Sequence, residues 1–151
     1  MSLQQDVDLL RNIPLFAKIE PSKLKLLAFT AERLSFSAGD LLCRQGEEGD
    51  SAYIIIDGEA DVIVDTDGGQ VTVATLKSND FLGETAILCD VPRTATVRAK
   101  TDLTALMISK DLFFQLVTQF PSMSIEIMRE LARRVERTTA QLREAVSQQK
   151  H

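Results

Sequence analysis

The chain has 151 residues, of which 44% are hydrophobic and 26% charged, and a formal net charge of −5 at pH 7. This composition is typical of one soluble domain with a substantial core, and the negative charge argues against nucleic-acid binding as its main function. The two cysteines predict neither a disulfide framework nor a metal site, and the only histidine is the terminal His151, which leaves no internal histidine for catalysis or metal binding.

Residues 1–31 predict two helices. Leu3, Val7 and Leu10 recur near helical spacing until Pro14 interrupts the pattern. A second helix is expected to begin at Pro21, because proline is favoured in the first turn of a helix and an apolar face follows it.

Residues 32–109 predict a β-roll. Glycine and aspartate turn signals recur at a spacing of roughly ten residues. The runs rich in β-forming residues between them are 52–56, 60–64, 71–76, 94–99 and 103–108. In the second run, Ala60, Val62 and Val64 alternate with other residues, as in a half-buried strand. We therefore expect an α+β fold: an antiparallel β-roll of jelly-roll type, with about eight strands, N-terminal helices and two C-terminal helices.

Residues 110–148 predict those two C-terminal helices. Ser109 is suited to cap the first, and Pro121 to begin a longer helix that ends near Ser147. Along the longer helix, apolar or small residues recur at alternating steps of three and four: Met128, Leu131, Val135, Thr138, Leu142 and Ala145. Such a stripe fits either a helix packed on its own β-roll or a homodimer seam through residues 121–147, and its length favours the dimer.

The same helix carries many arginines, at positions 129, 133, 134, 137 and 143. They alternate with glutamates at spacings that allow ion pairs along the helix. We therefore interpret them as one solvated face rather than as a nucleic-acid surface.

The most informative stretch is residues 81–97. Gly83 permits a tight backbone before a short helical turn that begins at Glu84, and Arg93 follows after Pro92. Free backbone N–H groups and an arginine favour an anion, whereas a carboxylate accepts hydrogen bonds from a hydroxyl or an amine. A phosphate next to a sugar hydroxyl satisfies both groups.

This stretch resembles the phosphate-binding cassette of the cyclic nucleotide-binding domain family. The family includes the bacterial catabolite activator protein, the regulatory subunits of cyclic-nucleotide-dependent kinases, and gated channels. The motifs that carry the resemblance are, in chain order, Gly39-Asp40, RQGE at 44–47, Asp57-Gly58, FLGETA at 81–86 and PRTATV at 92–97. The resemblance covers essentially the whole chain and implies a single regulatory domain over residues 1–151, with helices at 1–31, a β-roll at 32–109, the cassette at 81–97 and helices at 110–148.

The resemblance also implies a ligand-binding set: Gly83, Glu84, Thr85, Ala86, Arg93, Thr94 and Ala95. In it, Glu84 accepts a hydrogen bond from the ribose 2′-hydroxyl and Arg93 pairs with the cyclic phosphate. Val62 and Val73 are expected to line the pocket, although the pattern indicates β-roll core more strongly for each of them.

The preferred base is less clearly indicated. Thr94 follows the arginine, as in relatives that prefer cyclic GMP, although cyclic AMP sensors also place a hydroxyl residue there. On the long helix, Thr138 and Thr139 resemble the pair that contacts adenine in the catabolite activator, one member of which comes from the partner subunit. We expect cyclic AMP to be favoured over cyclic GMP, with Thr138 and Thr139 closing the site.

We thus expect a cytoplasmic sensor that transmits binding through its C-terminal helices to a linked or separate effector. No cofactor, metal, nucleic-acid contact or membrane contact is expected of this chain. The alternative is a dimerisation or docking module whose degenerate pocket binds no nucleotide. An enzyme of cupin type is disfavoured, because such sites need clustered histidines.

Overall fold

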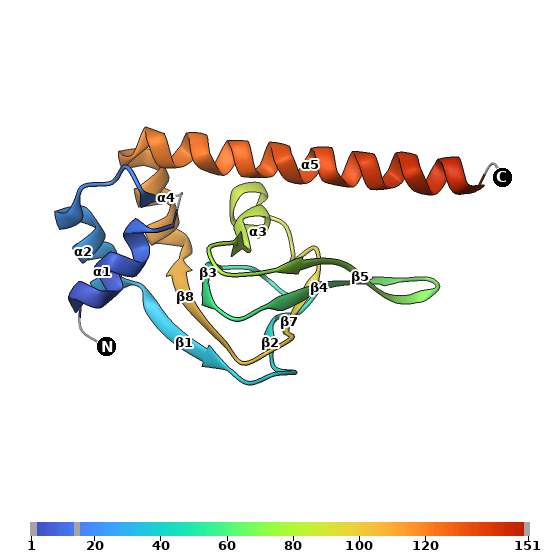
Figure 1. Ribbon diagram of the computed structural model, residues 1–151, viewed down its shortest axis with the longest axis horizontal. Coiled ribbons are helices and arrows are strands. Elements are labelled where there is room, and N and C mark those ends of the chain that lie inside the picture. Colours follow the sequence, from blue (N-terminus) through green and yellow to red (C-terminus); the bar gives the residue numbers. More distant parts are fainter. Residues whose placement is uncertain (1–2, 14–15, 150–151) are drawn as a thin grey trace.

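Two four-stranded antiparallel sheets form the centre of the protein, with strand orders β1-β8-β3-β6 and β2-β7-β4-β5 (Figure 1). The strands are β1 (Glu32–Phe36), β2 (Leu41–Cys43), β3 (Ser51–Asp57), β4 (Ala60–Thr66), β5 (Gly69–Leu76), β6 (Phe81–Leu82), β7 (Thr96–Ala99) and β8 (Leu103–Ser109). This computed structural model describes residues 3–13 and 16–149, so the expectations at Pro14 and His151 lie outside the described residues. The predicted α+β fold with an eight-stranded antiparallel β-roll is confirmed.

Five helices accompany the sheets within the described residues: α1 (Leu3–Arg11), α2 (Pro21–Thr30), α3 (Glu84–Cys89), α4 (Lys110–Gln119) and α5 (Pro121–Gln149). The first two and α4 gather at one end of the roll, whereas α5 runs the length of the molecule past α3 and the β4–β5 hairpin (Figure 1). The predicted cap of α4 is confirmed, because the Ser109 hydroxyl accepts a hydrogen bond from the Leu112 amide.

Strand β3 separates two hydrophobic cores. Ala52 and Ile54 belong to the core shared with the helices, and Tyr53 and Ile55 belong to the core inside the roll. A strand that is buried on both faces has a continuous run of apolar residues rather than alternating apolar and polar residues. This explains the sequence AYIII at 52–56.

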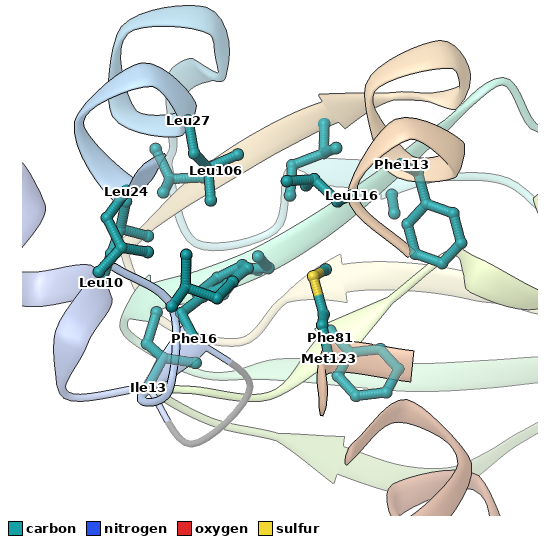
Figure 2. Close-up of a cluster of buried hydrophobic side chains, with 14 of the residues drawn as sticks. Leu10, Ile13, Phe16, Leu24, Leu27, Phe81, Leu106, Phe113, Leu116 and Met123 are labelled. Atoms are coloured by element: carbon teal, nitrogen blue, oxygen red, sulfur yellow. The ribbon is translucent and has the colours of Figure 1, made fainter. Parts of the chain in front are cut away.

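The core shared with the helices fixes the start of α5. Met123 and Ile127 are buried in the same cluster as Phe16 from the N-terminal segment and Phe81 from β6. Figure 2 shows Met123 next to Phe81. Further along α5 the apolar side chains become exposed, Val135 to 65% and Leu142 to 63%. The N-terminal half of the helix is therefore anchored, and its C-terminal half passes over the roll with an apolar stripe uncovered.

Strand β7 begins two residues later than the sequence pattern predicts, at Thr96 rather than Thr94. The Arg93 amide donates to the Glu47 carbonyl and the Gly46 amide donates to the Arg93 carbonyl, each at 2.8 Å. Because these bonds engage the backbone of Arg93 with the 44–50 loop, the segment before Thr96 stays outside the sheet ladder.

The first prediction compares two phenylalanines of opposite burial. Phe16 is fully buried, so Phe16→Ala leaves a cavity and is expected to lower the free energy of unfolding by about 3–5 kcal/mol. Phe29 is 77% exposed, so Phe29→Ala is expected to stay within about 0.5 kcal/mol of the parent protein. Urea unfolding measures both, and equal losses would contradict the placement of Phe16 in the core.

Candidate functional site

A cavity of about 850 Å³ lies between α5 and the β-roll. The whole predicted ligand-binding set lines it: Gly83, Glu84, Thr85, Ala86, Arg93, Thr94 and Ala95. Val62 and Val73 line it from β4 and β5, and Thr138 from α5, but Thr139 does not line it. The structure thus brings together the predicted residues from the cassette, the sheet and the long helix, with the exception of Thr139.

Arg93 is buried in this cavity wall, with 7% of its surface exposed. Its Nη2 donates to the Ser51 carbonyl at 2.8 Å, and its guanidinium lies 5.9 Å from the centre of the Tyr53 ring. Among the described residues, no carboxylate lies close enough to form an ion pair with it. Arg93 is therefore a desolvated cation whose partners are neutral, an arrangement that favours an added anion.

Two glycines make room for the Arg93 side chain. A Cβ atom on Gly49 would lie 2.9 Å from Nε of Arg93, and one on Gly83 would lie 2.5 Å from its Nη1. Gly83 also has a φ of +90°, which only glycine adopts at little cost. Both positions therefore require glycine for the arginine to lie where it does.

Glu84 begins α3 and is 3% exposed. Its Oε1 accepts a hydrogen bond from Nη1 of Arg134 at 2.8 Å, whereas its Oε2 is buried and has no hydrogen-bond partner within residues 3–13 and 16–149. Burial raises the pKa of the Glu84 carboxyl above its ordinary value of 4.5, and the positive charge of Arg134 opposes that rise. The free oxygen can accept a hydrogen bond from a ligand that carries a donor.

Arg134 was not predicted as a site residue, and its assignment to a solvated face is wrong. Besides Glu84, its guanidinium donates to the Phe81 carbonyl and lies 4.8 Å from the centre of the Phe81 ring. The side chains of Arg129, Arg133 and Arg137 are 62%, 57% and 64% exposed, as expected of a solvated face. The one signal for Arg134 was its position one helical turn before Thr138, on the same side of the helix.

The cavity thus contains a buried cation and a buried carboxylate that do not pair with each other. The cation can receive an anion, and the free carboxylate oxygen can receive a hydroxyl or amine. Over residues 3–13 and 16–149, no group of three or more histidine, cysteine, aspartate or glutamate residues is placed to hold a metal ion, and no helix is long and apolar enough to cross a membrane.

Comparison with known proteins gives a family match over residues 33–120, to the model described as the cyclic nucleotide-binding domain. A cAMP-dependent protein kinase regulatory subunit from Blastocladiella emersonii is 36% identical over 109 residues, covering 72% of this chain and 27% of that protein. A CRP-like cAMP-activated global transcriptional regulator from Mycobacterium tuberculosis is 28% identical over 140 residues, covering 92% of this chain and 62% of that protein.

Among solved structures, the regulatory subunit of a cAMP-independent protein kinase A from Trypanosoma brucei matches with a TM-score of 0.75 and 27% identity. The match covers 87% of this chain and 47% of that one. The chain spans about a quarter of the length of the curated kinase regulatory subunits that it matches, from 26% to 29% for three of them.

The second prediction concerns the raised pKa of Glu84. Because the folded protein holds this proton more tightly than the unfolded chain, Glu84 favours folding at low pH, and this contribution is lost as the pH rises from 4.5 through the raised value. Glu84→Gln removes the titration. The stability of the parent protein relative to this variant should therefore increase as the pH falls from about 7 toward about 5.

Urea unfolding across that pH range measures the effect. Glu144→Gln, at an exposed position on α5 that does not line the cavity, is the matched control for the loss of one carboxyl group. A relative stability of Glu84→Gln that does not change with pH would contradict the prediction.

Proposed function

This chain belongs to the cyclic nucleotide-binding domain family, and from that premise we propose that it senses a 3′,5′-cyclic nucleotide, with cyclic AMP preferred, and transmits binding through its C-terminal helices. One observation carries the proposal: among the described residues, buried Arg93 has no carboxylate partner and Oε2 of Glu84 has no hydrogen-bond partner, and both residues line the same cavity. The proposed role is regulatory rather than catalytic, in the cytoplasm, with no metal or other cofactor.

The phosphate would bind at Arg93. A cyclic phosphodiester carries a single negative charge, which one guanidinium can balance without an additional cation. We propose that Gly83, Thr85, Ala86, Thr94 and Ala95, which line the cavity around Arg93, complete the phosphate-binding cradle. Burial of Arg93 against neutral groups supports this assignment, because an added anion would compensate its desolvated charge.

The ribose would bind at Glu84. Its Oε2 has no partner, so the 2′-hydroxyl can donate to it without displacing Arg134 from Oε1. One carboxylate would then hold the ligand on one oxygen and α5 on the other. We propose that this shared carboxylate transmits binding, because a hydrogen bond from the ribose to Oε2 changes the strength of the hydrogen bond between Oε1 and Arg134. The coupling free energy between two sites in a protein is typically about 1–3 kcal/mol.

Cyclic AMP is the proposed ligand, and two relatives support it by name: the kinase subunit is cAMP-dependent and the transcriptional regulator is cAMP-activated. The trypanosome subunit belongs to a cAMP-independent kinase, so the family alone does not fix the ligand. We propose that Thr138 contacts the base from the same chain, and that Thr139, which does not line this cavity, contributes across a dimer.

We also propose a homodimer through α5. Met128, Val135 and Leu142 are spaced seven residues apart and are 60%, 65% and 63% exposed, so a seam of the coiled-coil type is uncovered in the single chain. A second α5 carries the matching stripe. Because the curated kinase subunits are several times longer than this chain, we propose that a linked or separate effector reads the signal.

The third prediction tests the phosphate contact. Arg93→Ala is expected to weaken binding of cyclic AMP by about 3 kcal/mol or more, because the phosphate would be buried without its counter-charge. Isothermal titration calorimetry with cyclic AMP and cyclic GMP measures the loss. Arg98→Ala is the matched control, since Arg98 is exposed on β7 and does not line the cavity.

If the parent protein gives neither heat nor thermal stabilisation with either nucleotide, the sensor proposal is wrong. The docking module with a degenerate pocket would then be the better description. If nucleotide binds equally well to Arg93→Ala, the assignment of the phosphate to Arg93 is wrong.

The fourth prediction tests the seam. Val135→Asp places a charge in the uncovered stripe and is expected to halve the mass measured by sedimentation, without unfolding the chain, because Val135 is exposed. Ala140→Asp adds the same charge at an exposed position outside the stripe and should leave the dimer intact. A parent protein that is monomeric at all concentrations would contradict the seam.

A further inference from the structure

Arg134, Thr138 and Gln141 line the cavity as one stripe along α5. Steps of four and three residues keep side chains on one side of a helix. At 1.5 Å per residue, Thr138 lies about 6 Å and Gln141 about 10 Å along the axis from Arg134. Since Arg134 contacts the carboxylate proposed to hold the ribose, the stripe extends from the ribose by a distance comparable to the long dimension of a nucleoside.

The three side chains differ in their free hydrogen-bonding capacity. The guanidinium of Arg134 is engaged by Glu84 and Phe81, and the Thr138 hydroxyl donates to the Arg134 carbonyl at 2.9 Å. Arg137, which also lines the cavity, donates to Glu130 at 3.3 Å. No hydrogen bond among the described residues engages the Gln141 side chain, so its amide keeps both a donor and an acceptor.

We propose that Gln141 reads the base, and that it is the residue that selects adenine over guanine. Adenine presents its N6 amino donor beside the N7 acceptor, and a glutamine amide matches both with two hydrogen bonds. Guanine presents two acceptors, O6 and N7, at the same edge, so the amide oxygen would face an acceptor. This inference rests on the proposed cyclic-nucleotide function and assigns its base selectivity to one residue.

The assignment gives Thr138 a smaller role. Its proton is already committed to the backbone of its own helix, so its hydroxyl can accept a hydrogen bond from the base but does not donate to it without breaking that bond. A group that offers both a donor and an acceptor pairs with two positions of the adenine edge, whereas a lone acceptor pairs with one. Gln141 offers both and Thr138 does not.

The fifth prediction is an exchange of selectivity at position 141. Gln141→Leu removes both hydrogen bonds and is expected to weaken cyclic AMP binding roughly tenfold, with cyclic GMP affinity little changed. Gln141→Arg introduces a side chain that pairs with guanine O6 and N7, so it is expected to invert the preference toward cyclic GMP. Both replacements are good helix formers at an exposed position, so the fold should be retained.

Calorimetric titration of each variant with both nucleotides gives the affinity ratio. Ala140→Arg is the matched control: it adds the same charge one residue away, at an exposed position that does not line the cavity, and should keep the parent ratio. Binding that persists with an unchanged ratio in both Gln141 variants would overturn the inference and leave the proposed function standing. Absence of binding to the parent protein would instead overturn the proposed function, and the inference with it.

Discussion

The burial of one guanidinium against neutral groups is the constraint on which the site depends. Arg93 is held by the Ser51 carbonyl, Gly49 and Gly83 leave room for its side chain, and the centre of the Tyr53 ring lies 5.9 Å from its guanidinium. A buried cation without a counter-charge is unfavourable, so this wall of the cavity is less stable than it would be with an anion present. Part of the free energy of ligand binding would come from compensating the desolvated charge of Arg93, which is unfavourable in the protein without ligand.

The carboxylate at the other side of the cavity links that wall to the long helix. The anchored start of α5 has its last fully buried side chain at Ile127, and Leu131 still packs against the same core while partly buried. One turn further on, Arg134 contacts the roll through Glu84 and Phe81. Because Arg134 engages one oxygen of this carboxylate and no described residue engages the other, the same side chain holds α5 and, in the proposal, the ligand.

Local patterns were sufficient for most of the fold and for part of the site. Alternation, turn glycines and the apolar run of β3 depend on short stretches of sequence, as does the cassette motif. Arg134 could not be recognised in this way, because an arginine spaced to pair with Glu130 looks the same on a solvated helix as on one lying over a cavity. Ser51 was also missed: it holds Arg93 chiefly through its carbonyl, a group that every residue has, across 42 positions of sequence. Such contacts follow from tertiary packing rather than from residue type.

The proposed binding mode separates affinity from selectivity. In it, the cassette groups, which lie in or against the packed roll, hold the phosphate and the ribose hydroxyl that all 3′,5′-cyclic nucleotides share. The base, which differs between these nucleotides, is assigned in the proposal to the stripe on α5, whose side chains beyond Arg134 are exposed. Substitutions in the cassette disturb buried groups and are expected to lower the free energy of unfolding by a large amount. Substitutions along the exposed stripe are expected to change it little. A chain built in this way can change its preferred base by altering one face of a single helix while the phosphate and ribose contacts stay the same.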